Sequence, residues 1–175
     1  MPYNQILKEI KKVTNKISEK DARTFVEEVR EAGRIFVVGV GRSGLVAKNL
    51  AMRLVRLEKE TYVVHETVNP KMREGDLLIA ISGSGETTDI LDTVKISRMM
   101  GARILTLTAV KHSSIIKISH NTIIIPAAIP VRLGDRYHLR ELIGVPERSA
   151  TKSLFELCAL IFLEVGVSRL NGNGK

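Results

Sequence analysis

Short apolar runs rich in β-branched residues alternate along the chain with stretches of helical periodicity. Turn residues follow each run, and such runs are typical of strands that are buried on both faces of a parallel sheet. We expect strands at Arg34–Gly39, Thr61–His65, Leu77–Ser82, Ile104–Thr108 and Thr122–Ile125. We expect helices between and after them at about Gly44–Leu57, Thr87–Met100, Ser113–Ser119 and Thr151–Leu170. The alternation predicts an α/β fold with a doubly wound, five-stranded parallel sheet flanked by helices.

Two further helices are expected before the first strand. From about Tyr3 to Lys20, apolar residues recur at helical spacing among lysines and glutamates, which is typical of an amphipathic helix. A second helix should run from Asp21, as its N-cap, to Ala32 and end at Gly33. The apolar stripe of the first helix consists of Ile6, Leu7, Ile10, Val13 and Ile17. Later helices already flank the sheet, so we expect this stripe to mediate association between subunits.

The length of 175 residues fits one domain with a single core. We expect residues 1–175 to form that domain, with residues 1–32 as its helical N-terminal part and residues 171–175 as a disordered tail. The stretch Pro126–Ala150 contains the charged run Arg132–Arg148. Loops of this length in compact domains are often functional or mobile.

Composition places the chain among ordinary globular proteins, with 44% hydrophobic and 26% charged residues. The single cysteine, Cys158, lies in an apolar helical run, where a buried thiol is expected. No apolar signal core opens the sequence, and no stretch reaches the length of a membrane span. These features predict a soluble, cytoplasmic protein with no membrane partner.

The net charge of +8 is compatible with a nucleic acid or with an anionic small molecule as partner. The densest basic group lies along the first helix and consists of Lys8, Lys11, Lys12 and Lys16. No aromatic residue lies among these lysines, so stacking on bases is not supported, and we expect a solvated helix face and no nucleic-acid partner.

Ligands of open parallel sheets bind outside the carboxyl ends of the strands, so the turns after the strands carry the candidate chemistry. The first of these turns is Gly39-Val40-Gly41-Arg42-Ser43-Gly44, which we name the glycine turn. It satisfies GxGxxG after a strand and before a helix, the pattern of a dinucleotide-binding turn. Glu66 follows about twenty residues downstream, where a ribose-binding acid is found in such folds. The glycine turn therefore leaves a nucleotide-dependent enzyme open.

A second unusual turn follows the third strand, and a dinucleotide fold does not need it. Its residues are Ser82-Gly83-Ser84-Gly85-Glu86-Thr87, named here the serine loop. Its glycines let several backbone N–H groups face one point, and the next helix adds its positive end. The hydroxyls of Ser82, Ser84 and Thr87 supply further donors. The combination predicts a site for a phosphate dianion, while the alternative is that Ser84 or Thr87 only caps the helix.

The glycine turn and the serine loop together resemble the sugar isomerase (SIS) family of phosphosugar-binding domains. The likeness covers about Gly33–Leu163, and the serine loop is its specific part. Within the family, the chain is most similar to 6-phospho-3-hexuloisomerases in length, in the leading pair of helices and in the segment GVGRSGLVAKNLAMRL. The likeness continues in His65–Pro70 (HETVNP) and in Ser153–Glu156 (SLFE).

The resemblance implies the strand order 2-1-3-4-5 and a set of site residues. Those implied to bind phosphate are Ser82, Gly83, Ser84 and Thr87, and those implied to face the sugar are Gly41, Arg42 and Ser43. Isomerases of this type move a carbonyl along the sugar through an enediol, which requires a base that removes the proton beside the carbonyl. The family assigns this role to the glutamate of the SLFE-like motif, which is Glu156 here.

Both carboxylates expected at this edge also have simpler interpretations. Ser153–Glu156 reads as a capping box, in which Glu156 would accept a hydrogen bond from the backbone N–H of Ser153. Glu66 is included among the substrate-binding candidates because it lies at the same edge, and the alternative is an exposed loop acid.

The chain departs from hexuloisomerases in its histidines. Those enzymes usually end with an Arg-His motif, whose histidine is thought to assist proton transfer in a neighbouring subunit's site, and nothing like it follows Leu163. His138 in the long charged loop is the candidate to replace it, and the alternative is a solvated loop histidine. The loop Arg132–Arg148 is longer than expected for a hexuloisomerase, which leaves the exact sugar open.

The leading functional hypothesis is conversion of 3-hexulose 6-phosphate to fructose 6-phosphate by a homodimer or homotetramer. No cofactor is needed for this reaction, and no metal-ligand cluster is evident in the sequence. One alternative is a module that senses a phosphosugar without chemistry, as some relatives do when joined to DNA-binding segments. The other is the nucleotide-dependent enzyme, which leaves the serine loop unexplained.

Overall fold

Five parallel strands form one sheet in the order β2-β1-β3-β4-β5. The strands are β1 (Ile35–Gly39), β2 (Thr61–Val63), β3 (Leu77–Ile81), β4 (Arg103–Thr108) and β5 (Asn121–Ile124). The helices are α1 (Tyr3–Thr14), α2 (Glu19–Glu31), α3 (Arg42–Val55), α4 (Thr88–Met99), α5 (Ser114–Ile118) and α7 (Leu154–Leu170). The structure is a computed structural model and describes residues 3–129 and 153–172. The expected doubly wound sheet and its strand order are confirmed.

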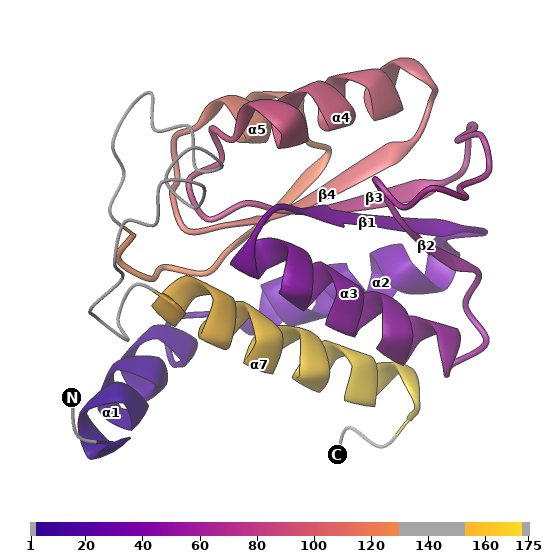
Figure 1. Cartoon of the computed structure of the whole chain (residues 1–175). Coiled ribbons are helices and arrows are strands. Elements are labelled where there is room, and N and C mark those ends of the chain that lie inside the picture. The colour runs from indigo at the N-terminus through magenta and orange to yellow at the C-terminus, as the bar shows by residue number, and fades with distance from the viewer. Residues whose placement is uncertain (1–2, 130–152, 173–175) are drawn as a thin grey trace.

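The helices form two layers, one on each face of the sheet (Figure 1). Helices α4 and α5 cover one face, α2, α3 and α7 cover the other, and α1 packs against α7. Each layer has its own hydrophobic cluster against the sheet, and the cluster beneath α2, α3 and α7 is the larger. All five residues of β3 are fully buried, as expected for a central parallel strand covered on both faces.

Helix α7 packs against α1, α2 and α3 and therefore connects the elements of the larger layer. Its buried side chains include Phe155, Cys158 and Phe162. Phe162 meets Phe25 of α2 edge to face, with ring centroids 5.9 Å apart. Gly166 lies directly over the Phe25 ring, where a Cβ would overlap it. Burial raises the pKa of the Cys158 thiol to about 11, so this expected buried cysteine is uncharged.

The boundaries of the first two helices differ from those expected. Helix α1 ends at Thr14 rather than near Lys20, and the N-cap of α2 is Ser18 rather than Asp21. Asp21 instead occupies the third helical position, where its carboxylate accepts the Ser18 N–H at 3.2 Å while the Ser18 hydroxyl accepts the Asp21 N–H at 3.1 Å. The pair is a reciprocal capping box. Asp21 therefore takes part in the N-terminal cap, but it is not the N-cap residue, as was expected.

Most of the apolar stripe of α1 is covered within the chain. Val13 is buried, and Ile6, Ile10 and Ile17 pack against the larger core cluster. Only Leu7 of the stripe stays open, with 58% of its surface exposed. The stripe therefore contributes to the core, mainly through contact of α1 with α7.

No helix within residues 3–129 and 153–172 is long and apolar enough to cross a membrane. The structure describes the predicted long loop only up to residue 129, so the charged run Arg132–Arg148 and His138 lie outside the described residues.

Candidate functional site

The carboxyl ends of the strands bring together the glycine turn after β1, the serine loop after β3 and the first turn of α7 (Figure 1). Helices α3 and α4 begin at these two turns, so their positive ends point toward the same edge. The sequence places the three segments far apart, and the sheet order makes β1 and β3 neighbours.

Backbone packing explains much of the glycine turn. A Cβ at Gly39 would lie 2.5 Å from the carbonyl oxygen of Ser43, which would prevent α3 from starting so close to β1. Gly41 has φ 59° and ψ −129°, a conformation that glycine adopts readily and other residues rarely do. Ser43 is buried with 7% exposure, while the Arg42 side chain keeps 27% of its surface exposed. Arg42 is therefore the residue of this turn that presents a polar side chain at the edge.

The serine loop holds its hydroxyls in a compact arrangement. Ser82 is buried, and its hydroxyl accepts the Gly85 N–H at 3.2 Å and lies 3.2 Å from the hydroxyl of Thr87. The Ser84 hydroxyl accepts the Glu86 N–H at 3.2 Å. Thr87 is the N-cap residue of α4, but its side chain makes no capping hydrogen bond. Helix capping therefore does not explain the hydroxyls of this loop.

The glycines of the serine loop fit against its neighbours on both sides. The Gly83 carbonyl accepts the Ala109 N–H at 3.0 Å and the Thr108 hydroxyl at 3.1 Å, both from the end of β4. On the other side, a Cβ at Gly83 would approach the Phe155 ring to 3.1 Å. Gly85 has φ 65° and leaves no room for a side chain beside Ser113. The loop is thus held between the end of β4 and the helix that carries Glu156.

Glu156 lies in the first turn of α7 and faces Arg42 at the start of α3. The Arg42 Nε lies 3.7 Å from Glu156 Oε2, and the two side chains are 27% and 16% exposed. The Ser153 side chain makes no capping hydrogen bond, so its half of the expected capping box is not formed. The structure therefore brings together two residues that were selected from separate motifs, and both side chains are only partly exposed.

Glu66 takes part in a different interaction at the same edge. It follows β2 and pairs with Lys48 of α3 at 2.7 Å, and both side chains are more than half exposed. The hydrogen bond from Lys48, together with its charge, lowers the pKa of the Glu66 carboxyl below its ordinary value of 4.5. The preceding residue, His65, has φ 75° and ends β2 earlier than expected, and its ring lies 3.4 Å from the Thr93 hydroxyl of α4.

Two interactions were not foreseen from the sequence. The Glu86 carboxylate accepts the Ser114 N–H at 2.7 Å and so joins the serine loop to the segment after β4. Lys48 pairs with Glu66, and only its place two turns into α3 could have indicated this.

His120 accepts the Ile104 N–H at 2.9 Å, which is a structural role. Among the residues that the structure describes, no cluster of three or more His, Cys, Asp or Glu could hold a metal ion.

Comparison with known proteins gives consistent results. The family model of the SIS domain matches residues 28–135. An uncharacterized protein of Aeropyrum pernix is 36% identical over 87% of this chain and 76% of its own length. The 3-hexulose-6-phosphate isomerase of Bacillus subtilis is 31% identical over 95% of this chain and 85% of its own.

Among solved structures, a protein from Methanococcus jannaschii superposes with a TM-score of 0.74 at 29% identity. The superposition covers 97% of this chain and 86% of that one. Its crystal structure was described as inferring a molecular function of 3-hexulose-6-phosphate isomerase.

Proposed function

The chain belongs to the SIS domain family, and from this premise we propose that it is an isomerase that converts 3-hexulose 6-phosphate to fructose 6-phosphate. The observation that carries the proposal is the position of Glu156 beside Arg42, at the same sheet edge as the hydroxyls of the serine loop. This reaction requires a carboxylate that acts as the base and a site that binds the phosphate of the sugar.

In the proposed complex, the serine loop binds the phosphate of the sugar. The hydroxyls of Ser82, Ser84 and Thr87 and the backbone N–H groups donate to its oxygens, and the positive end of the twelve-residue helix α4 favours its charge. Binding of the phosphate fixes one end of the substrate, so the reacting carbons are held in a defined position relative to the catalytic residues. The sugar then extends toward the first turns of α3 and α7.

The proposed reaction moves a carbonyl from C3 to C2. The Glu156 carboxylate removes the proton from C2, the electrons of that C–H bond form a C2–C3 double bond, and the C3 oxygen takes a proton to give the enediol. The proton on the C2 hydroxyl is then released, the carbonyl forms at C2, and a proton is returned to C3. Arg42 places its positive charge where the oxygens carry negative charge during these steps. His138 remains the proposed second proton-transfer group, outside the described residues.

Solvent deuterium tests this proposal because the position of exchange identifies the reaction. Fructose 6-phosphate is incubated with the protein in D₂O, and NMR follows the loss of each C–H signal. We expect exchange at C3, since a C2–C3 enediol labels that carbon. Exchange at C1 instead would indicate an aldose–ketose isomerase acting on another hexose phosphate. Thermal stabilisation by sugar phosphates without any exchange would indicate a sensor, and preferential stabilisation by NAD would indicate the nucleotide-dependent enzyme.

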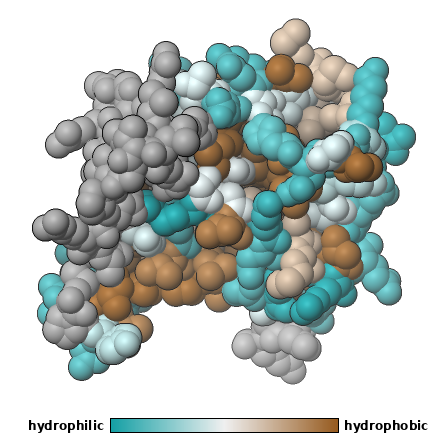
Figure 2. All heavy atoms as spheres, in the orientation of Figure 1, coloured by the Kyte–Doolittle hydropathy of each residue, from teal (hydrophilic) through white to brown (hydrophobic). Residues whose placement is uncertain are grey.

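We also propose that the protein forms a homodimer or homotetramer through α7 and α3 rather than through the stripe of α1. Leu157, Ile161 and Val165 recur every four residues on the outer face of α7, and each is at least 36% exposed. On the neighbouring helix α3, Leu45 and Met52 are 70% and 45% exposed. Figure 2 shows hydrophobic residues gathered over these helices. A second copy of the chain would cover this face.

Light scattering of the Ile161→Lys variant tests this assembly. We expect a smaller oligomer than that of the parent, because an ammonium group would be buried in the apolar contact. Met99→Lys is the matched control, since Met99 is 85% exposed on α4, in the opposite layer. An unchanged mass for Ile161→Lys, or an equal loss in the control, would contradict the proposed face.

A further inference from the structure

A cavity of about 270 Å³ lies beside the serine loop, on the side of β4 and α5. Apart from Ile116, its lining residues are polar or charged: Glu86, Lys111, His112, Ser113, Ser114 and Lys117. None of these residues except Glu86 belongs to the motifs of the candidate site. The reaction proposed above leaves this cavity without a role.

The wall of the cavity is held by bonds to the serine loop. The Glu86 carboxylate accepts the Ser114 N–H at 2.7 Å, and the Gly85 carbonyl accepts the Ile115 N–H at 3.2 Å. Because Glu86 is engaged in this bond, its charge is directed at the backbone of the segment after β4. The wall of the cavity is therefore attached to the serine loop, and Glu86 belongs to both.

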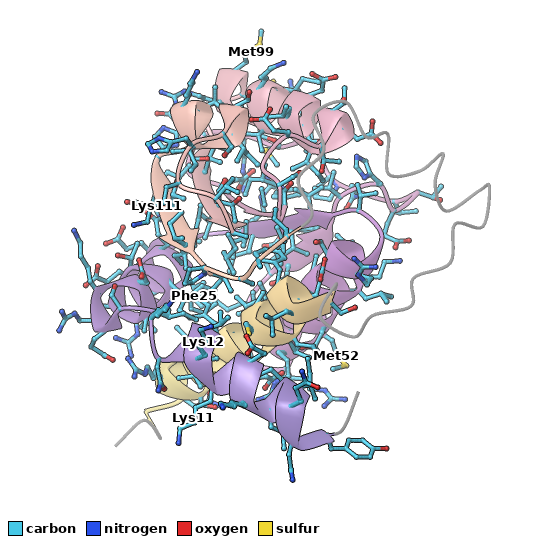
Figure 3. The ribbon with its side chains drawn as sticks, turned by 90° about the vertical axis from the view of Figure 1, so that its left-hand side faces the viewer. Lys11, Lys12, Phe25, Met52, Met99 and Lys111 are labelled. Carbon is cyan, nitrogen blue, oxygen red and sulfur yellow. The ribbon has the colours of Figure 1, made fainter. Side chains whose placement is uncertain are left out.

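The charge of the cavity is positive. Lys111 and Lys117 are exposed, and within residues 3–129 and 153–172 neither of them takes part in an ion pair. Two ammonium groups exceed the single carboxylate of Glu86. Figure 3 looks onto this edge of the sheet and labels Lys111 well apart from Lys11 and Lys12 of α1. The cavity thus has a local positive charge that does not come from the basic face of α1.

Ser113 supplies the second observation. It is only 6% exposed, yet its hydroxyl has no hydrogen-bond partner among the described residues. A buried polar group without a partner is uncommon in proteins and costs free energy. This hydroxyl lies against Gly85, at the junction of the cavity and the serine loop. An oxygen atom of a ligand in the cavity would satisfy it.

We propose that this cavity is a second anion subsite, which binds a phosphoryl group next to the one on the serine loop. The inference rests on the proposed function in one respect, since the serine loop is taken to hold the first phosphate. Lys111 and Lys117 provide the charge, and the Ser113 hydroxyl donates a hydrogen bond. The second phosphoryl group belongs either to the same ligand or to free inorganic phosphate.

Titration calorimetry with inorganic phosphate tests the subsite in protein that is already saturated with fructose 6-phosphate. We expect phosphate to bind this complex, and the Lys111→Gln/Lys117→Gln double variant to weaken its binding about tenfold. The affinity for fructose 6-phosphate should change less than about threefold. Lys11→Gln/Lys12→Gln removes the same charge from α1, and phosphate should bind this control as it binds the parent.

Fructose 1,6-bisphosphate distinguishes the two sources of the phosphoryl group. If one ligand spans both subsites, the bisphosphate binds about tenfold more tightly than fructose 6-phosphate, excludes added phosphate and loses this advantage in the double variant. If the subsite takes free phosphate, the bisphosphate has no such advantage and phosphate still binds. Either pattern supports the subsite and assigns its ligand.

Two results would overturn the proposal. One is phosphate that binds only in competition with fructose 6-phosphate and equally well to the double variant. The other is an equal loss of phosphate binding in the α1 control, which would show a general effect of net charge. Deuterium exchange at C3 is read independently, so a missing subsite and a missing isomerase activity give different results.

Discussion

Two arginine–carboxylate pairs lie at opposite edges of the same sheet and differ in almost every respect. Arg34 and Asp76 precede β1 and β3 at the amino edge, and their side chains are 9% and 3% exposed. The Arg34 guanidinium donates to both Asp76 oxygens, at 2.9 and 2.6 Å. It also donates to the Lys71 carbonyl at 3.0 Å, and Asp76 accepts the Arg73 N–H at 2.7 Å. The bond with Asp76 raises the pKa of Arg34 above its ordinary value.

At the carboxyl edge, Arg42 and Glu156 lie 3.7 Å apart, beyond hydrogen-bond distance, and both are more exposed. The amino-edge pair is bidentate and surrounded by backbone partners, an arrangement that holds strands together. We propose that the amino edge of this sheet mainly serves stability and the carboxyl edge serves binding, and the following predictions test that division.

The largest effect is expected for Glu156→Gln. Loss of the general base should lower the rate of C3 exchange about 10³-fold, while the melting temperature stays close to that of the parent. Glu164→Gln is the matched control, because Glu164 lies two turns further along α7 and pairs with Arg53 of α3 at 3.1 Å. NMR exchange rates should place the control within about threefold of the parent. Exchange by Glu156→Gln at the parent's rate would remove Glu156 from the role of base.

Asp76→Ala should mainly affect stability. It leaves a buried guanidinium without its partner, so the melting temperature should fall by about 10 °C, measured by circular dichroism. Below the transition, the exchange rate per folded molecule should match that of the parent. Replacing both residues, as Arg34→Met with Asp76→Leu, should recover part of the loss because no unpaired charge remains. If the melting temperature of Asp76→Ala equals that of the parent, the amino edge does not have the proposed structural role.

A smaller effect is expected for Ser84→Ala in the serine loop. It removes one hydrogen bond to the phosphate, so KM for the sugar phosphate should rise about tenfold with little change in kcat. Ser168→Ala serves as control, because Ser168 lies on α7 and, among the described residues, its hydroxyl donates only to the Glu164 carbonyl, at 2.9 Å. A KM unchanged by Ser84→Ala would argue against phosphate binding at this position.

The smallest effect concerns Glu66 and Lys48, an exposed pair at the carboxyl edge. The pKa of the Glu66 carboxyl is lowered by this pair. The pair therefore stabilises the fold at pH values above the ordinary pKa of 4.5, and this stabilisation is lost as the pH falls through the lowered pKa. Melting curves of Glu66→Gln and the parent should differ by at most about 2 °C near pH 7 and coincide near pH 3. A difference that grows toward acid would contradict this sign.

The sequence allowed the strands and their direction to be predicted because buried parallel strands are apolar on both faces, as Leu77–Ile81 are. The element ends were less accurate. Ser18 and Asp21 are both good capping residues, and only the backbone decides which of them takes the N-cap. Likewise, β2 ends at Val63, whereas the apolar run suggested a strand as far as His65, which has a positive φ.

The candidate site was predictable in its parts but not in its arrangement. The composition of the serine loop predicts a phosphate site, and the resemblance to the SIS family implies that Glu156 is the base. That Glu156 faces Arg42 depends on the packing of α7 against α3, which no local pattern contains. The cavity beside the serine loop was missed for the same reason, since Lys111 and Lys117 carry no motif.

Helix α7 carries Glu156 at one end and fills the core along the rest of its length, with Phe155 packed against Gly83 of the serine loop. With Glu156 as the proposed base, selection for a stable fold and selection for activity would act on the same seventeen residues. A substitution in α7 can therefore impair either property, so divergence toward new sugars should accumulate in the segment after β4 instead. Among relatives of this chain, the sequence of α7 would then diverge more slowly than the rest of the proposed site.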